Sequence, residues 1–402
     1  MRICMHVLGT ARTDARVLRE ASALVDAGHT VTIVDIEPAT GRPRVETLDG
    51  VRMLHLVMPS WFTPARFKPW FLVKLMRVIV AGIHATWSVR ADVYHAHDAN
   101  ALFACYATAR LRRKPLVLDA HELPFVEPST MRWRLLTLLT TGVTRRLFAG
   151  CQAIITVSPP IVDELRQRYG GPHAVVVRNA LPYRVPIASD RLRRAVGADS
   201  STRIALYQGN LQEDRGLSRL VYAAQHLQPG CMIVLMGQGP SERMLHDLIL
   251  REGVGDRVRI LPAVPYVELL EWTVSASVGL IVYPPSHSPN VRLCLPNKLF
   301  EYQMAGLPVL ASALPAVADV VTRYDFGCIL ASVEPEAMGR AINAMLTDTS
   351  SLQRWHDNAL AVARDELNWE HEQERLIELY RDLMMSNSAQ PSTGAKPVVT
   401  SA

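Results

Sequence analysis

The sequence predicts two consecutive α/β domains, each built on a doubly wound parallel sheet. The chain opens with an apolar strand at Arg2–Leu8, a helical pattern at Asp14–Ala27 and a second strand at Thr30–Asp35. A strand, a helix and a strand within about 35 residues form a βαβ unit, which implies parallel strands and a right-handed crossover. The same alternation resumes after a break in mid-chain, and 402 residues are enough for two such domains.

The first domain is expected to span residues 1–185. Its remaining elements are expected at Val93–Ala96, Ala101–Leu111, Pro115–Leu118, Ala153–Val157 and Ala174–Val177, with a helix between the last two that ends at Tyr169. Residues 186–200 lose the apolar rhythm and contain several arginines, so they are expected to form the linker.

The second domain is expected to span residues 201–365. Its strands are expected at Arg203–Gln208, Met232–Met236, Val258–Leu261, Val278–Val282 and Pro308–Ala311, and its helices at Leu217–Leu227, Ser241–Glu252, Val267–Ser275, Asn297–Ala305 and Leu352–Glu366. A further helix at 366–385 is expected to pack back on the first domain. The tail from 386 to 402 is rich in small and polar residues and is expected to be disordered.

Composition is that of a soluble globular protein, with 49% apolar and 20% charged residues. The most apolar stretch, Phe71–Val89, contains Lys74, Arg77 and His84 and is a poor membrane span. The six cysteines are scattered without a C-x-x-C pair, which favours free thiols in a reducing cytoplasm. We therefore expect a cytoplasmic protein.

Charge is distributed unevenly along the chain. Residues 1–185 carry 24 basic and 14 acidic residues, whereas the remainder carries 19 and 24. No acid occurs between Asp49 and Asp92, a stretch that holds Arg52, Arg66, Lys68, Lys74, Arg77 and Arg90 together with Trp61, Phe62, Phe67, Trp70 and Phe71. This mixture favours docking on the inner face of an anionic membrane, and it argues against a nucleic acid as partner. A solvated helix face above core aromatics explains it equally well.

The first candidate binding element is the loop from Gly209 to Gly216, which follows a predicted strand and precedes a predicted helix. Loop amides and a helix N-terminus attract an anion, and Arg215 adds a fixed positive charge. An ordinary βα turn with a surface arginine is the alternative.

The second candidate is the short helix that contains Lys298 and Glu301. These residues are three apart and share one face of the helix. A cation there suits a phosphate, and a carboxylate accepts hydrogen bonds from two vicinal ribose hydroxyls. A surface ion pair between the two is the alternative.

Three weaker signals lie at strand ends of the first domain. His121 directly follows a strand and is able to bond a sugar hydroxyl. His95 and His97 have the i, i+2 spacing of metal ligands, but no further ligand has suitable spacing, so a structural role is favoured and no metal site is expected. Gly9 marks the first βα turn without a dinucleotide-binding fingerprint.

Taken together, these motifs resemble the retaining family-4-type glycosyltransferases (glycosyl transferases group 1), which have the GT-B fold of two Rossmann-like domains. The resemblance runs from Arg2 to about Tyr380. The family's G-R-L-x-x-x-K-G element corresponds to G-N-L-Q-E-D-R-G here, with Arg215 as the phosphate-binding cation and Asn210 in place of an arginine.

The family's pair of glutamates eight positions apart is half present. Glu301 matches the second, ribose-binding glutamate, and Gly306-Leu307-Pro308-Val309 matches the end of the motif. Leu293 stands where the first glutamate would be, which leaves the sugar open.

Other resemblances complete the expected donor site. The turn containing Gly237 resembles the family's G-x-G-P turn, and the loop around Val264 resembles the one under the nucleobase. His121 resembles the first-domain histidine that faces the donor sugar. The expected donor-binding residues are therefore Gly9, Gly209, Asn210, Arg215, Gly216, Gly237, Val264, Lys298 and Glu301.

The resemblance implies a retaining transferase that moves a sugar from a nucleotide-diphosphate sugar to a glycan or lipid-linked acceptor. Arg215 and Lys298 would stabilise the departing diphosphate and His121 would position the sugar. No cofactor or metal is expected, and no D-x-D motif occurs. The alternatives are a non-catalytic carbohydrate- or nucleotide-sugar-binding protein of the same fold and a nucleotide-sugar epimerase.

Overall fold

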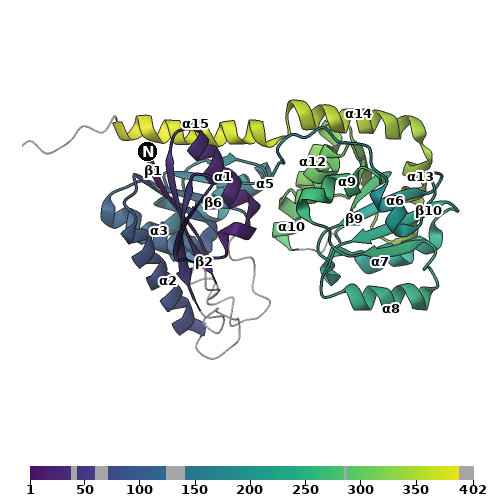
Figure 1. Ribbon diagram of the computed structural model, residues 1–402, viewed down its shortest axis with the longest axis horizontal. Helices are drawn as coiled ribbons and strands as arrows, with labels where there is room; N and C mark the ends of the chain where they lie inside the picture. Colours follow the sequence, from purple (N-terminus) through teal and green to yellow (C-terminus); the bar gives the residue numbers. More distant parts are fainter. Residues whose placement is uncertain (38–42, 59–70, 124–140, 285–287, 389–402) are drawn as a thin grey trace, which may run out of the picture. The chain divides into compact units, whose positions relative to one another are not determined.

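The computed structural model describes residues 1–37, 43–58, 71–123, 141–284 and 288–388. The chain divides into two compact units (Figure 1). The first holds residues 1–156, 165–177 and the C-terminal part from 373, and the second holds 157–164 and 178–372. Trp61, Phe62, Arg66, Phe67, Lys68, Trp70 and the tail from 389 lie outside the described residues.

The first unit is built on an eight-stranded sheet. Its strands are β1 (Arg2–Val7), β2 (Thr30–Glu37), β3 (Val45–Leu48), β4 (Val51–Val57), β5 (Val93–His97), β6 (Leu116–Ala120), β7 (Ala153–Thr156) and β8 (Ala174–Val176). They lie in the order β3-β4-β2-β1-β5-β6-β7-β8, and each neighbouring pair is parallel except β3 and β4. The sequence predicted a parallel sheet but did not predict the β3–β4 hairpin, which extends that sheet at one edge.

Helices cover this sheet and shield its central strands from solvent. They are α1 (Ala15–Asp26), α2 (Phe71–Ser88), α3 (Asp98–Arg112) and α5 (Pro159–Tyr169). Helix α1 begins where the Asp14 carboxylate accepts from the amides of Arg16 and Val17, a standard N-cap. The central strands β1, β5 and β6 are buried almost throughout, as expected of a parallel sheet covered on both faces.

The last helix, α15 (Trp369–Ser388), begins in the second unit and continues in the first. Its Tyr380 is fully buried, and the hydroxyl lies 2.7 Å from Nδ1 of His95 on β5. This buried contact ties the C-terminal part of α15 to the sheet of the first unit.

The second unit is built on a six-stranded parallel sheet in the order β11-β10-β9-β12-β13-β14. Its strands are β9 (Arg203–Gln208), β10 (Cys231–Met236), β11 (Val258–Leu261), β12 (Val278–Ile281), β13 (Val309–Ser312) and β14 (Gly327–Leu330). Its helices are α6 (Arg191–Val196), α7 (Leu217–Ala223), α8 (Glu242–Glu252), α9 (Leu269–Thr273), α10 (Pro289–Leu293), α11 (Asn297–Met304), α12 (Pro315–Arg323), α13 (Pro335–Thr347) and α14 (Thr349–Asp365).

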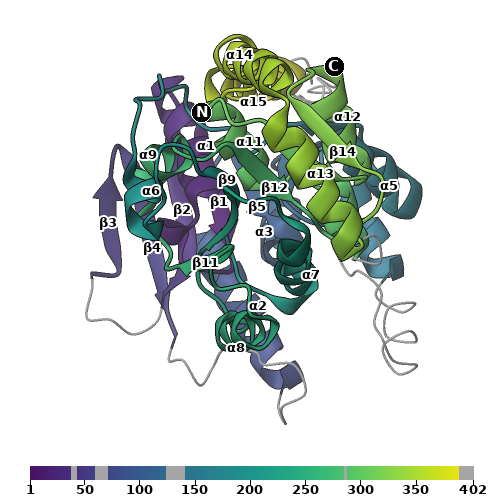
Figure 2. The same cartoon turned by 90° about the vertical axis from the view of Figure 1, so that its right-hand side faces the viewer.

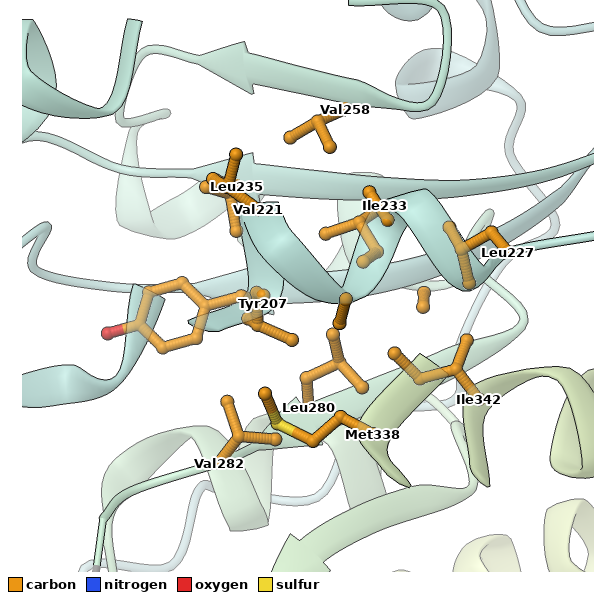
Figure 3. Packing of buried hydrophobic residues seen from close by; sticks show 14 of the residues in the cluster. Tyr207, Val221, Leu227, Ile233, Leu235, Val258, Leu280, Val282, Met338 and Ile342 are labelled. Carbon is orange, nitrogen blue, oxygen red and sulfur yellow. The ribbon is translucent and has the colours of Figure 1, made fainter. Parts of the chain in front are cut away.

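One core of this unit lies between β9, β10, β12 and helices α7 and α13, which pack side by side (Figures 2 and 3). Aliphatic side chains such as Ile233, Leu280 and Ile342 fill it. Tyr207 is at its edge, with its hydroxyl pointing away from the aliphatic residues (Figure 3). Packing of the Tyr207 ring therefore anchors the end of β9, and the Tyr207 hydroxyl lies outside the aliphatic core.

The region expected to be a linker, residues 186–200, lies within the second unit and contains α6. Leu192 and Val196 of this helix are buried in the core of that unit. The change of unit falls at residues 177 and 178 instead.

None of the helices in the described ranges is long and apolar enough to cross a membrane.

Candidate active site

The second unit changes its strand order at β9. The chain runs from β9 outward to β10 and β11, and then returns to place β12 on the other side of β9. In open α/β sheets, ligands bind beyond the carboxyl ends of the strands at such a switch point. The loops after β9 and β12 meet this condition, and they carry the motifs found in the sequence.

The loop after β9 is held by backbone hydrogen bonds to its neighbours. Gly209 donates to Met236 O at 2.9 Å, Leu211 donates to Gln238 O at 2.9 Å, and Gly237 donates to Leu261 O at 2.9 Å. A Cβ atom at Gly237 would stand 1.8 Å from Gly209 O. Gly237 therefore has a structural role, because only a residue without a side chain lets these two turns approach.

Gly216 ends the same loop and directly precedes α7. It has a φ of 75°, and a Cβ atom there would stand 2.6 Å from Val282 O. The loop is thus held close to the end of β12. Asn210 is exposed, and its carbonyl accepts from the Tyr207 hydroxyl at 2.9 Å.

Two cations gather above two tyrosine rings at this edge. Lys298 Nζ lies 3.5 Å from the centre of the Tyr207 ring and 5.5 Å from that of Tyr283. The Arg215 guanidinium lies 5.1 Å from the centre of the same Tyr283 ring. Tyr283 follows β12 and Tyr207 is in β9, so the fold brings the two cations predicted from separate motifs to one place.

Lys298 is in an unfavourable place for a cation. It is 7% exposed, and Nζ has no hydrogen-bond partner within the described residues. It also lies in the first turn of α11, at the positive end of the helix dipole. Burial lowers its pKa well below the usual value, Glu301 partly opposes this, and Arg215 adds to it. Burying an ammonium that lacks an acceptor costs free energy, and an anion beside Nζ would offset that cost.

Glu301 does not hydrogen-bond Lys298. Its Oε2 accepts instead from Nε2 of Gln208, the last residue of β9, at 2.6 Å. The simple surface ion pair considered from the sequence is therefore not what the fold builds. The carboxylate is half-buried one helical turn beyond Lys298, beside the two cations.

Val264 is half-buried in the loop after β11 and packs against the second core of this unit. Gly209, Asn210, Arg215, Gly216, Gly237, Val264, Lys298 and Glu301 thus all follow or flank strand ends of the second unit. Gly9 and His121 belong to the first unit. Gly9 O accepts from the Ile36 amide at 3.1 Å, which fixes the turn after β1.

His121 is held by carboxylates in the first unit. Its Nε2 bonds Asp119 Oδ2 at 2.8 Å, and its backbone amide donates to Asp98 Oδ1 at 3.0 Å. Burial opposes protonation, but the two carboxylates outweigh it and raise the pKa of His121 to about 9. At neutral pH the ring is an imidazolium.

Asp119 is fully buried and is the centre of a larger network. The Arg16 guanidinium donates to the Asp119 carboxylate through Nε and Nη2, each at 2.8 Å. Its Nη2 also forms an ion pair with Glu20 at 3.1 Å. Burial works against its ionisation, but Arg16 and His121 hold the pKa of Asp119 well below the usual value. A bidentate arginine pair of this kind fixes orientation as well as charge.

No residue with suitable sequence spacing joins His95 and His97 as a candidate ligand. The fold nevertheless brings Glu20 and Asp119 to them, with one possible ligand atom of each within 4.8 Å of the others. Sequence spacing missed this because Glu20 lies on α1 and Asp119 on β6. Arg16, however, already binds both carboxylates, so this buried cluster neutralises its own charge.

Several residues of the site escaped the sequence analysis. Tyr207 and Tyr283 end or follow strands of a switch point, and that position is the signal that identifies them. Gln208 ends β9 inside the motif that was examined, but its contact with Glu301 spans 93 positions of the chain. Arg16 and Asp119 are joined across 103 positions, and no local pattern encodes that distance.

Comparisons with known proteins agree with this geometry. Residues 15–182 match the family model described as Glycosyltransferase Family 4, and residues 188–362 match the one described as Glycosyl transferases group 1. Glycogen synthase of Mycobacterium tuberculosis is 24% identical over 368 residues, which cover 87% of this chain and 86% of that protein.

Solved structures with the same fold cover nearly the whole chain. Sucrose-phosphate synthase from Thermosynechococcus elongatus has a TM-score of 0.76 at 18% identity and covers 96% of this chain and 100% of its own. HepE from Anabaena, solved in complex with UDP, has a TM-score of 0.70 at 15% identity and covers 95% and 99%. The chain is thus a glycosyltransferase of the group 1 family, with two Rossmann-like domains in the GT-B fold.

Proposed function

We propose that this glycosyltransferase binds a nucleoside-diphosphate sugar on its second unit and transfers the sugar with retention of anomeric configuration. The observation that carries the proposal is the buried Lys298 Nζ, which lacks a hydrogen-bond acceptor in the described part of the chain and shares Tyr283 with Arg215. A diphosphate supplies the acceptor oxygens that Lys298 lacks, and it adds stronger acceptors for Arg215, whose guanidinium lies 3.5 Å from oxygens of Asp214 and Gln212.

The same groups support the chemical step. As the bond from the sugar to the diphosphate breaks, negative charge grows on the leaving oxygen, and fixed cations stabilise it. Lys298 and Arg215 take this role without a metal ion. Glu301 accepts hydrogen bonds from the ribose, and His121, as a charged donor, positions the sugar.

A binding screen tests the donor assignment. UDP, GDP and dTDP, with their sugars, are titrated calorimetrically; UDP is the first choice because HepE, which shares the fold, was solved with it. One of the three should bind clearly tighter as the diphosphate than as the nucleoside. Equal affinity for nucleoside and diphosphate would contradict the role of the two cations.

The chemistry is tested with the donor that binds. Slow hydrolysis of that donor, followed by NMR at early times, should release the sugar with the anomeric configuration of the donor. Inverted sugar would refute retention, an altered sugar still on its nucleotide would indicate an epimerase, and binding without turnover in any acceptor mixture would indicate a carbohydrate-binding protein.

We further propose that the acceptor is lipid-linked or presented at an anionic membrane. Helix α2 supports this, because Val73, Met76 and Val80 are each at least half exposed, at spacings that place them on one face. Trp87 is 43% exposed and lies farther along the same face of the helix. The exposed Arg77 lies next to this face. An apolar stripe flanked by cations is the pattern of a helix that lies on a lipid surface.

A further inference from the structure

Gln208, the last residue of β9, forms hydrogen bonds with two successive residues of α11, Glu301 and Tyr302. The Gln208 amide N donates to the Tyr302 hydroxyl at 3.1 Å, and the Gln208 side chain donates to Glu301 at 2.6 Å. Tyr302 is fully buried, and its hydroxyl in turn donates to Leu206 O at 3.0 Å. One residue of the sheet therefore fixes the position of the helix and also contacts its carboxylate.

The side-chain amide of Gln208 has only one sensible orientation. The Thr273 hydroxyl, on α9, lies 2.9 Å from Gln208 Oε1 and 2.8 Å from the Leu269 carbonyl oxygen, so the two oxygens share its one proton. The Glu301 carboxylate only accepts, so it places the NH₂ group of Gln208 toward itself and leaves Oε1 facing the Thr273 hydroxyl. Gln208 is 2% exposed and Thr273 is fully buried, so water does not compete for these bonds.

This arrangement restrains the Glu301 carboxylate from the side of the sheet. Glu301 has three side-chain torsions, and it is half-buried at the edge of the site. A hydrogen bond from a buried and anchored donor selects one carboxylate plane out of the many that this side chain can adopt. A ligand hydroxyl that binds the carboxylate then meets it in a prepared orientation.

We propose that Gln208, anchored by Thr273, is a positioning residue that aims the Glu301 carboxylate at the ribose hydroxyls of the donor nucleotide. This inference rests on the proposed function and adds to it the device that sets the preference for ribose. Gln208 does not touch the nucleotide; it acts through Glu301.

The test compares affinity for UDP and GDP with affinity for their 2′,3′-dideoxy analogues by calorimetry. Gln208→Met keeps the side-chain volume and removes the donor. It should lower the preference for ribose by about fivefold to tenfold, the range of one hydrogen bond, and leave affinity for the dideoxy analogue unchanged. Thr273→Val should give a smaller loss in the same direction, because it frees the amide without removing it.

Two further variants separate positioning from damage to the fold. Gln303→Met is the matched control, since Gln303 is also a buried glutamine of this region, on α11, and bonds the Leu367 carbonyl at 3.3 Å. It should retain the preference for ribose. Glu301→Gln should abolish that preference, and adding Gln208→Met to it should cause no further loss.

The inference is overturned if Gln208→Met keeps the wild-type preference, or if it weakens the ribose and dideoxy forms equally. In either case the proposed function stands, because the wild type still binds the diphosphate. If the wild type binds neither UDP nor GDP better than the nucleosides, the proposed function fails and this inference fails with it.

Discussion

Lys298 shows how one residue connects stability and function. Its ammonium lies over the Tyr207 ring at 3.5 Å, and this cation–π attraction compensates for part of the hydration free energy that burial removes. A ring cannot replace a full set of acceptors, so the free protein holds this cation at a cost. Binding a diphosphate removes that cost, and this difference is the origin of the expected affinity.

The first prediction concerns the two cations. Arg215→Ala and Lys298→Ala should each weaken binding of the preferred nucleoside diphosphate by about 1.5–3 kcal/mol, the range for hydrogen bonds to charged groups. Binding of the bare nucleoside should change far less. Calorimetry on both ligands measures this, with Arg251→Ala on exposed α8 as a control that should behave as wild type. Equal losses for the two ligands would contradict phosphate recognition.

The second prediction concerns the protonation of His121. Its pKa of about 9 lies above the unfolded value, so protonation stabilises the fold fully below pH 6.5 and this stabilisation is lost as the pH rises from 6.5 to 9. Burial and Asp119 raise the pKa of Glu20, which acts in the same direction. The temperature of thermal unfolding should therefore fall as the pH rises over this range. In His121→Asn the unfolding temperature should depend less on pH.

The partner residue gives a sharper version of the same test. Asp119→Asn should lower the pKa of His121 in an NMR titration, because burial is then opposed by Asp98 alone. The variant should also lose about 3–5 kcal/mol of stability, since the charge on Arg16 is left buried with less compensation. A His121 resonance that still titrates near 9 in this variant would exclude Asp119 as the cause.

At the scale of elements, the site depends on how closely the turns after β9 and β10 approach. The backbone bonds at Gly209 and Leu211 continue the ladder of the sheet beyond the ends of the strands. The approach requires a residue without a side chain at Gly237. Gly237 is thus explained by packing between two turns, and contact with a ligand is not needed to account for it.

The third prediction follows from that packing. Gly237→Ala should destabilise the second unit by about 1–3 kcal/mol, as overpacking does, because its Cβ would collide with Gly209 O. It should also weaken diphosphate binding by displacing the loop that carries Arg215. Gly255→Ala is the control, since its Cβ would meet only Ile249 at 3.9 Å. Denaturant unfolding with and without nucleotide separates the two effects, and equal stabilities for both variants would refute the packing argument.

At the scale of the whole molecule, charge is divided between the parts of the chain. The first 185 residues carry an excess of ten positive charges, and the remainder carries an excess of five negative charges. The exposed apolar face of α2 belongs to the positive part, and the residues proposed to bind the diphosphate belong to the second unit. Membrane docking and donor binding should therefore be separable by mutation.

The fourth prediction tests that separation. Lys74→Glu combined with Arg77→Glu should abolish sedimentation with anionic vesicles, because each basic residue near a charged surface contributes about 1 kcal/mol. Donor affinity should stay unchanged. The pair Arg243→Glu and Arg251→Glu on exposed α8 makes the same change in net charge and should still sediment. Wild type that stays in the supernatant at low salt would end the membrane proposal and point to a soluble acceptor.

Local sequence patterns were enough to predict the two-domain α/β architecture and most strands of both sheets. Apolar runs such as Cys231–Met236, which are buried on both faces, leave a local signature that needs no knowledge of distant residues. The motifs that hold Arg215, Lys298 and Glu301 were found in the same way, because a loop between a strand and a helix is a local feature. The hairpin of β3 and β4, the helices α6, α10, α12 and α13 and the strand β14 were not predicted, and the shortest of these elements have weak periodicity.

Which of these groups meet depends on how the strands are ordered in the folded sheets. It placed Lys298 and Arg215 over Tyr283, it paired Glu301 with Gln208 in place of Lys298, and it surrounded His95 with groups from three other elements. The physical reason is that the order of strands in a sheet is not written in any one segment. A βαβ unit can add its next strand on either side, and the return of β12 to the flank of β9 creates the point where these side chains converge.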